Sequence, residues 1–182
     1  PTTLLAQADS CIGSKSSINL STVKNFVGTY NPPNEIYVSS EFLRTLSDND
    51  ISSGIGEMIK IFGIYGKEKF LELKKDYPYL RHDFNLLQKY IRGSLMLKKS
   101  IIEIDEFDKN ERLVLNYGHT FGHAIEASTN YAVPHGIAVS MGCDFANFVS
   151  MKMGYSDGST YELMSVISRE NYKHFKSTVF SE

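Results

Sequence analysis

Residues 116–126 read N-Y-G-H-T-F-G-H-A-I-E, and the interpretation of the surrounding chain starts from this stretch. Its pattern predicts a helix over about 118–128, on which His119 and His123 share one face because they are four residues apart. Three roles are open to them: a metal-binding pair, an acid/base pair, or two hydrogen-bonded core residues. The spacing alone favours none of these, since H-x-x-x-H is a weaker signal than H-E-x-x-H.

A third histidine lies a short distance further along the chain. After a turn at 130–134, His135 begins a second apolar helix, which is expected over about 136–153. Helices that are joined by a short connection pack as antiparallel neighbours, so His135 can lie beside the first two histidines. Three imidazoles and one carboxylate would make a catalytic zinc shell with a position left for water or substrate.

A candidate for the carboxylate lies in S-G-I-G-E-M-I-K, residues 53–60. Glu57 and Lys60 stand at i and i+3 of a largely apolar helix, and the two glycines before Glu57 allow a close approach of another backbone or a ligand. This context favours a site over a surface. The alternative is a solvated ion pair of small energetic value.

The composition excludes several classes of protein. The 182 residues are 42% hydrophobic and 22% charged with a net charge of -2, which indicates about one folded domain without a basic field for nucleic acid. No apolar run is long enough to span a bilayer, and the first ten residues lack the features of a signal peptide. Cys11 and Cys143 form no C-x-x-C motif and indicate a reducing compartment, so we expect a cytoplasmic protein. Because the chain begins at Pro1 rather than Met, it is interpreted as a processed product or a piece of a longer protein.

The apolar periodicity predicts a mostly α fold with a small β-containing N-terminal segment. Residues 1–40 are irregular to β, with a short strand expected at 35–39, where Ile, Tyr and Val suit a pleated surface. Polar residues at 47–50 and Asp83 are good helix-start residues, and Gly93 is expected to weaken the helix that follows Asp83. Further helices are expected at 67–75, 118–128, 136–153 and 159–178.

Several other polar residues have two interpretations. Lys15 lies in a Gly/Ser loop that suggests an anion contact, but the chain has neither a P-loop nor G-x-G-x-x-G, and Lys15 and Lys24 are more often solvated loop lysines. Arg112 can share a helix face with Asn116. Neighbouring residues alone suggest a surface position for Lys98, which precedes Lys99, and for the histidines His82 and His174.

Seven segments in a fixed order together resemble dehydroquinate synthase and its relatives, the sugar phosphate cyclases. They are P-T-T-L-L-A-Q-A-D-S (1–10), I-G-S-K-S-S-I-N (12–19), K-N-F-V-G-T (24–29), F-L-R-T-L (42–46), S-G-I-G-E-M-I-K (53–60), L-N-Y-G-H-T-F-G-H-A-I-E (115–126) and P-H-G-I-A-V-S-M-G (134–142). The resemblance covers residues 1 to about 150 and implies a dehydroquinate synthase-like, multi-helical C-terminal domain. Residues 47–182 would be this metal- and substrate-binding helical domain, and residues 1–46 a remnant of the NAD-binding α/β domain.

The resemblance also implies a role for each matched position, and it separates the two histidines of the opening stretch. The metal ion, zinc or cobalt, would be bound by Glu57, His119 and His135, whereas His123 would face the substrate. The positions implied to act in catalysis or substrate binding are Asp9, Lys15, Asn25, Lys60, Lys98, Arg112, Asn116 and His123. Those implied to bind NAD are Thr2, Thr3, Asp9, Lys15, Lys24, Asn25, Phe42 and Thr45.

The activity implied by the resemblance is the phosphate-eliminating cyclisation of a sugar phosphate in the shikimate pathway, with transient oxidation by NAD and a divalent metal ion, in a homodimer. The alternatives are a divergent cyclase of the deoxy-inosose or valiolone type, a metal-dependent alcohol dehydrogenase relative, or a module that keeps the fold without turnover. Ser14 and Ile137 depart from the family pattern, where a glycine and an acid are usual, and they bear on the choice of substrate. The family's Gly-rich NAD loop has no match in these 182 residues, so this chain alone is predicted to be inactive.

Overall fold

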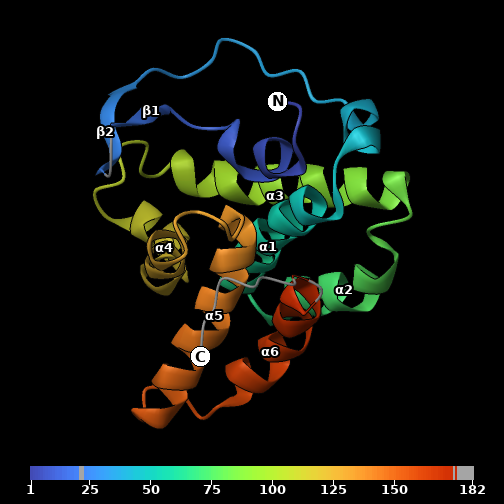
Figure 1. Ribbon diagram of the computed structural model, residues 1–182, viewed down its shortest axis with the longest axis vertical. Helices are drawn as coiled ribbons and strands as arrows, with labels where there is room; N and C mark the ends of the chain where they lie inside the picture. Colours follow the sequence, from blue (N-terminus) through green and yellow to red (C-terminus); the bar gives the residue numbers. More distant parts are fainter. Residues whose placement is uncertain (21–22, 174, 176–182) are drawn as a thin grey trace.

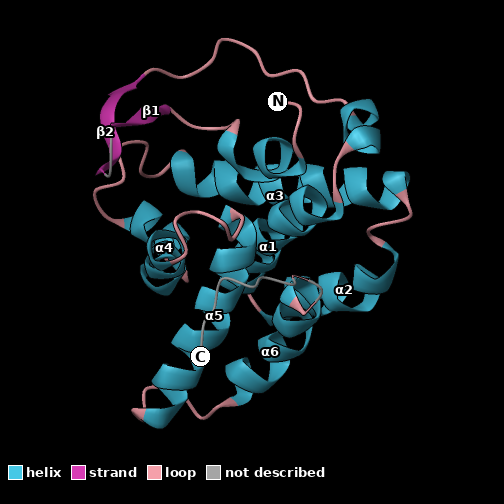
Figure 2. Ribbon diagram, viewed as in Figure 1, coloured by secondary structure: helices cyan, strands magenta, loops and turns pink. Residues whose placement is uncertain are grey.

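The computed structural model describes residues 1–20, 23–173 and 175, without the side chains of residues 19 and 23–25. Within these residues the chain forms one hairpin and a set of long helices (Figures 1 and 2). They are β1 (Lys15–Leu20), β2 (Val23–Tyr30), α1 (Asp48–Tyr65), α2 (Lys67–Asp76), α3 (Phe84–Ile102), α4 (His119–Ser128), α5 (His135–Lys152) and α6 (Ser159–Tyr172). Shorter 3-10 or π-helical segments lie at Ala6–Ser10, Ser40–Thr45, Tyr77–Tyr79 and Glu111–Asn116. The predicted mostly α fold with a small β-containing segment near the N-terminus is confirmed.

Two helices begin at the predicted residues because short polar side chains cap their free amides. The hydroxyl of Ser47 accepts a hydrogen bond of 3.2 Å from a backbone N–H in the first turn of α1, and the carboxylate of Asp83 accepts one of 2.9 Å at the start of α3. Helix α3 runs unbroken through Gly93, where an added Cβ would lie 3.0 Å from the ring of Phe62. This glycine makes room for a core aromatic ring and does not interrupt the helix.

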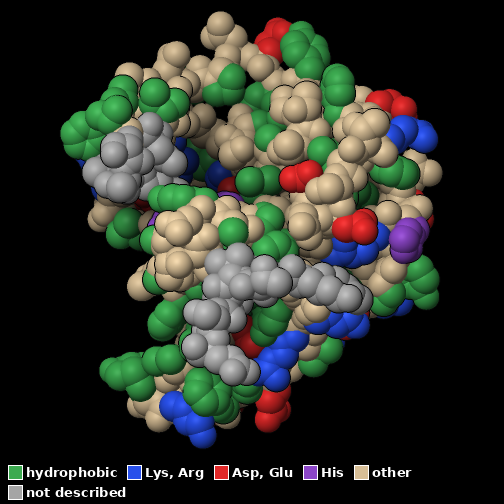
Figure 3. All heavy atoms as spheres, viewed as in Figure 1, with side chains coloured by type: hydrophobic (Ala, Val, Ile, Leu, Met, Phe, Trp, Pro, Cys, Tyr) green, Lys and Arg blue, Asp and Glu red, His purple; other side chains and the backbone are tan. Residues whose placement is uncertain are grey.

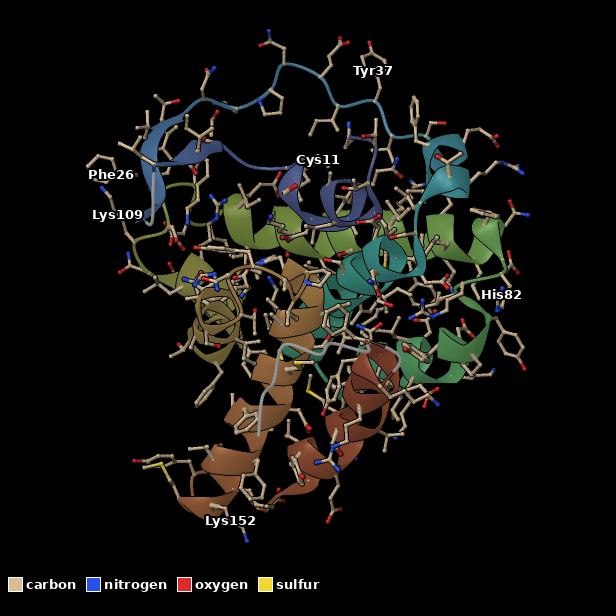
Figure 4. The ribbon with its side chains drawn as sticks, in the orientation of Figure 1. Cys11, Phe26, Tyr37, His82, Lys109 and Lys152 are labelled. Carbon is tan, nitrogen blue, oxygen red and sulfur yellow. The ribbon has the colours of Figure 1, made fainter. Side chains whose placement is uncertain are left out.

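Two other predictions had a different outcome. The strand expected at 35–39 is wrong: within the described chain this segment has no regular secondary structure and pairs with no strand, and Tyr37 points into solvent (Figure 4). The helix expected over 159–178 is observed as α6 up to Tyr172, and residues 174 and 176–178 lie outside the described residues. None of the described helices is long and apolar enough to cross a membrane.

Helix α1 is the central element and packs against α2, α3, α5 and α6 (Figure 1). Its side chains Ile55, Met58 and Phe62 belong to the main core cluster, and their removal from water is a principal source of stability. Because α1 is covered by neighbours on several sides, Glu57 and Lys60 are buried as well. The alternative of a solvated ion pair is therefore not observed, and the acid and the lysine lie inside the protein.

Helices α1 and α5 cross with their backbones in contact. The backbone N–H of Gly136 donates a hydrogen bond of 3.0 Å to the hydroxyl of Ser53. A Cβ added at Gly56 would overlap the carbonyl group of Gly136, and one added at Gly136 would overlap that of Ser53. Only residues without side chains permit this approach. Since Glu57 follows one glycine and His135 precedes the other, the crossing brings these two residues together.

The hairpin lies beside the C-terminal end of α3 (Figure 2). Strands β1 and β2 pair antiparallel, with Lys15 opposite Tyr30 and Ile18 opposite Val27. The ring of Tyr30 packs edge-on against Phe107 in the segment after α3, at 5.3 Å between ring centroids. The hairpin is thus attached to the helical body through the segment that precedes α4.

Candidate metal and substrate site

A cavity of about 510 Å³ lies between the hairpin, α3 and the starts of α4 and α5. Figure 3 shows the molecule hollowed beside the hairpin, with Lys and Arg side chains inside the hollow. Most of the side chains for which a substrate or metal role is predicted line this cavity. They are Asp9, Lys15, Lys60, Lys98, Arg112, Asn116, His119, His123 and His135.

Three helices bring the predicted metal ligands together. The Oε1 atom of Glu57, on α1, lies 3.3 Å from Nε2 of His135 and 3.8 Å from Nε2 of His119. The three ligand atoms all lie within 4.8 Å of one another. Two imidazole nitrogens and one carboxylate oxygen are a usual ligand set of a catalytic zinc ion, with a fourth position left for water or substrate.

Further contacts orient both imidazole rings. The Nδ1 atom of His119 lies 3.2 Å from the carbonyl oxygen of Tyr117, and Nδ1 of His135 lies 3.0 Å from Oε1 of Glu126. Each contact leaves the Nε2 atom directed at Glu57, as is common for histidines that bind metals. Ile137, which departs from the family pattern next to His135, is fully buried in an apolar cluster, so the carboxylate that supports His135 is that of Glu126.

Burial and neighbouring charges set the protonation of these ligands. Burial alone raises the pKa of Glu57, but Lys60 and the two imidazoles outweigh it and hold the pKa well below its ordinary value. Burial, with the charge of Lys60, lowers the pKa of His119 to about 4, so this ring is neutral at pH 7. Burial also lowers the pKa of His135, but hydrogen bonds to Glu126 and Glu57 outweigh it and raise the pKa to about 9. The protonated ring of His135 thus lies between two carboxylates, with Nδ1 facing Glu126 and Nε2 facing Glu57. A divalent cation would replace the proton on Nε2.

The position of His123 is compatible with two roles. Its ring centroid lies 5.1 Å from that of His119, and its side chain is 44% exposed toward the cavity. The ligand atoms of His123, Glu126 and His135 also lie within 4.8 Å of one another. The assignment of His123 to the substrate therefore stays a prediction. Of the remaining histidines, His82 is exposed and projects outward between α2 and α3 (Figure 4), and His174 lies outside the described residues.

Two buried lysines, Lys60 and Lys98, line the cavity. Lys60 is 2% exposed and pairs with Glu57. Lys98 is also buried: its Nζ lies 2.9 Å from the carboxylate of Asp9 and donates a hydrogen bond of 2.7 Å to the Asp9 carbonyl. The surface position suggested by its neighbour Lys99 is not observed, because Lys98 lies on the inner face of α3 and only Lys99 is exposed.

Several residues of the cavity lining were not singled out from the sequence, among them Asp108, Glu126 and Tyr131. Asp108 forms an ion pair with Lys15 across the cavity. Both Asp108 and Tyr131 have positive φ values, 59° and 61°, a conformation that is uncommon for residues with a side chain. The spacing gave a signal for Glu126, which stands three residues after His123 and so shares its helix face, but it gave none for Tyr131.

Of the residues implied to bind NAD whose side chains the structure describes, only Asp9 and Lys15 line this cavity. The side-chain amide of Gln7 brings the starts of two segments together, because it donates hydrogen bonds of 3.1 Å to the carbonyl of Pro1, before Thr2, and of 2.8 Å to that of Ser39, before the Ser40–Thr45 segment. Thr3 caps the first helical turn, and Phe42 and Thr45 are exposed. Lys24 and Asn25 belong to β2, and their side chains lie outside the part of the chain that the structure describes.

Comparison with solved structures shows the class of fold. A 2-deoxy-scyllo-inosose synthase superposes with a TM-score of 0.82 at 24% identity, and a 2-epi-5-epi-valiolone synthase from Streptomyces hygroscopicus, with NAD+ and Zn2+ bound, with a TM-score of 0.86 at 21% identity. Each comparison covers 100% of this chain and 51% of the other. The fold is that of the sugar phosphate cyclases.

Sequence comparison identifies the family. The family model for the 3-dehydroquinate synthase N-terminal region matches residues 1–53, and that for the C-terminal region matches residues 54–179. The chain is 42% identical to the 3-dehydroquinate synthase of Dictyoglomus thermophilum over 161 residues, and 42% identical to that of Paracoccus denitrificans over 157 residues. These alignments cover 87% and 85% of this chain but 45% and 42% of the relatives, so the chain spans about half the length of the curated relatives it matches. The chain belongs to the 3-dehydroquinate synthase family. The division of the chain after residue 46 stays a prediction.

The contact between Glu126 and His135 predicts the effect of a conservative substitution. Glu126→Gln removes the charge that holds the His135 ring, so we expect the affinity for zinc to fall about 10- to 100-fold, as for other outer supports of metal ligands. A competition titration of the full-length protein against a chelator measures this. Glu111→Gln, at an exposed glutamate, is the control and is expected to bind zinc normally. Unchanged affinity for zinc in Glu126→Gln would show that Glu126 does not support the metal site.

Proposed function

We propose that this chain carries the metal- and substrate-binding part of an enzyme that eliminates phosphate from a sugar phosphate and closes a carbocycle, as in dehydroquinate synthesis. One observation carries the proposal: two members of a three-ligand metal group and four cationic side chains line the same cavity. Glu57, His119 and His135 form the metal group. The cations are Lys15, Lys60, Lys98 and Arg112. Membership of the 3-dehydroquinate synthase family supports the choice of reaction.

The residues present fit the cofactors that this reaction needs. A divalent metal ion fits the group of Glu57, His119 and His135, whose ligand atoms converge and whose carboxylate is fully buried. NAD would bind along the exposed edge formed by Thr2, Thr3 and the Ser40–Thr45 segment. When bound, the metal ion would polarise oxygen atoms of the substrate, and NAD would take up a hydride and return it within one turnover. A solved 2-deoxy-scyllo-inosose synthase holds carbaglucose-6-phosphate, NAD+ and Co2+, which supports this set.

The cationic side chains of this chain would bind and orient the anionic substrate. Arg112 can hold a carboxylate or phosphate group through two parallel hydrogen bonds, and Lys98 adds a point charge. Burial lowers the pKa of Lys60, but the charges of Glu57 and Asp9 outweigh it and raise the pKa, so Lys60 remains a cation. His123 faces the cavity and can exchange a proton or a hydrogen bond with the substrate.

Phosphate release by the full-length protein tests the proposal. The panel of sugar phosphates includes the precursor of dehydroquinate, from which we expect phosphate without net formation of NADH. Release only from another sugar phosphate would identify a divergent cyclase, the reading that Ser14 and Ile137 favour. Steady NADH formation from an alcohol without phosphate release would identify a metal-dependent alcohol dehydrogenase. No reaction with any of these would leave a module that keeps the fold without turnover. The homodimer implied by the family stays a prediction.

The 182-residue chain alone is expected to release no phosphate. Among its NAD-binding candidates with described side chains, Thr2, Phe42 and Thr45 are exposed, and only Asp9 and Lys15 line the cavity beside the metal group. The assay compares equal concentrations of this chain and of the full-length protein at saturating NAD and zinc. Zinc binding by the shorter chain serves as the control for folding. Measurable phosphate release by the shorter chain would contradict the prediction.

A further inference from the structure

Asp105 is a buried carboxylate outside the groups described so far. It follows the end of α3 and is 8% exposed. Its side chain accepts three hydrogen bonds from backbone N–H groups further along the chain: Oδ1 accepts from Lys109 at 3.1 Å, and Oδ2 accepts from Asn110 at 2.8 Å and from Arg112 at 3.1 Å. These hydrogen bonds hold the pKa of Asp105 below its ordinary value, so the carboxylate is ionised at neutral pH.

The three hydrogen bonds fold residues 105–112 around one carboxylate. In this segment Asp108 has a φ of 59° and Asn110 lies outside the helical and extended regions, so the turn is unfavourable on its own. A buried acceptor that satisfies three donors can stabilise such a backbone, since hydrogen bonds to a charged group are stronger than those between neutral groups. Asp105 therefore fixes the backbone position of Arg112, from which its side chain extends.

The guanidinium of Arg112 lies close to two segments of the chain. Its Nη1 donates to the carbonyl of Glu106, within its own segment. Gly13 leaves room for it, since a Cβ added there would lie 2.8 Å from Nη2. Within the described chain, the Glu106 carbonyl is the one acceptor of a side-chain hydrogen bond from Arg112, although this side chain carries five N–H donors and borders the cavity. The remaining donors are available to an anionic ligand.

We propose that Asp105 is a positioning residue for anion binding: through the backbone of residues 109–112 it aims the Arg112 guanidinium at the cavity. The inference rests on the proposed function, because it takes the ligand of the cavity to be an anionic sugar derivative. Arg112 would bind a carboxylate or a phosphate group, because both can accept two parallel hydrogen bonds from a guanidinium. Asp105 itself does not line the cavity and is not a catalytic residue.

The test is a double-mutant cycle on anion binding by the full-length protein. Asp105→Asn keeps the shape of the side chain, but its amide nitrogen would face a backbone donor in place of an acceptor. We expect the dissociation constant of an anion to rise about 10-fold or more, while the affinity for zinc changes less than about twofold. In the Arg112→Ala background, Asp105→Asn is expected to cause no further change, because both substitutions remove the same interaction. Isothermal titration with inorganic phosphate and, separately, with quinate shows which anionic group Arg112 meets.

Control variants separate positioning from a general loss of structure. Asp157→Asn alters another loop carboxylate that accepts a backbone N–H, that of Ser159 at 2.9 Å, but it does not line the cavity and should bind both anions normally. If Asp105→Asn does not fold, Asp105→Glu keeps the charge and displaces the carboxylate by one methylene, and it should also weaken anion binding.

The inference is supported if Asp105→Asn or Asp105→Glu weakens the binding of either anion and if the same substitution has no effect in the Arg112→Ala background. It is overturned by unchanged binding of both anions, by an equal loss in both backgrounds, or by a wild-type protein that binds neither anion. Absence of phosphate release from every sugar phosphate would end the proposed function but would leave a positive result of this cycle standing.

Discussion

Replacing His119 by alanine is expected to lower the affinity for zinc or cobalt by more than about 100-fold, because the loss of an outer support alone costs about 10- to 100-fold. His119 supplies one of the three ligand atoms of the metal group, and its Nε2 lies 3.8 Å from Oε1 of Glu57. His123→Ala is expected to leave the metal affinity within a few fold of wild type. In the wild-type protein, Nε2 of His123 instead lies 3.9 Å from the carboxylate of Glu126, on the cavity side.

The two variants are also expected to differ in activity. His123→Ala should lower phosphate release about 100-fold with the metal still bound, since a positioned acid/base group contributes about that much or more. His119→Ala should lose activity together with the metal. Metal content after dialysis and the rate of phosphate release are measured on the same full-length preparations, with His82→Ala, an exposed histidine, as the control. Equal loss of metal from both variants would contradict the separate roles of the two histidines, and loss from His123→Ala alone would favour the group of His123, Glu126 and His135.

Gly136→Ala is expected to destabilise the protein by about 3 kcal/mol and to abolish high-affinity metal binding. The added methyl group would overlap the carbonyl of Ser53 on α1, which is backbone and cannot rotate away. To remove the overlap, α5 must move away from α1, and His135 then moves away from Glu57. Urea unfolding and zinc titration of the full-length protein measure the two effects.

The control for this substitution is the same change in another helix. At Gly93 of α3 an added Cβ would meet only the tip of the Phe62 ring, at 3.0 Å, and this side chain can adjust. Alanine is the better helix former, so Gly93→Ala should stay within about 1 kcal/mol of wild type and bind zinc normally. Wild-type stability and metal affinity in Gly136→Ala would show that the contact between α1 and α5 is looser than described.

The helices could be predicted because their signals are local. Ser47 and Asp83 cap helices with side-chain atoms three residues from the amides that they satisfy, and the apolar period of α1 needs no distant partner. The strand at 35–39 failed for the opposite reason. A strand depends on a neighbour elsewhere in the chain, which no local propensity supplies.

The site was predictable only in part. Spacing and short helix connections suggested His119, His123 and His135 as neighbours with Glu57 as a candidate carboxylate, and it was the resemblance to a family that separated His123 from the metal ligands. The encounter of Glu57 with His135 depends on two glycines at a helix crossing, and single-helix periodicity does not show which helices cross. Asp105 could not be identified, because three amides meet its carboxylate only once the segment has folded.

The crossing of α1 and α5 also has a consequence for folding. Glu57 and His135 lie on separate helices, so these two metal ligands come together only when the two helices dock. Docking and metal uptake are then linked equilibria: an ion that binds only the docked state adds its binding free energy to the folding of the chain. Free metal concentration in the surroundings would in this way set how much of the protein is folded as well as how much of it is loaded.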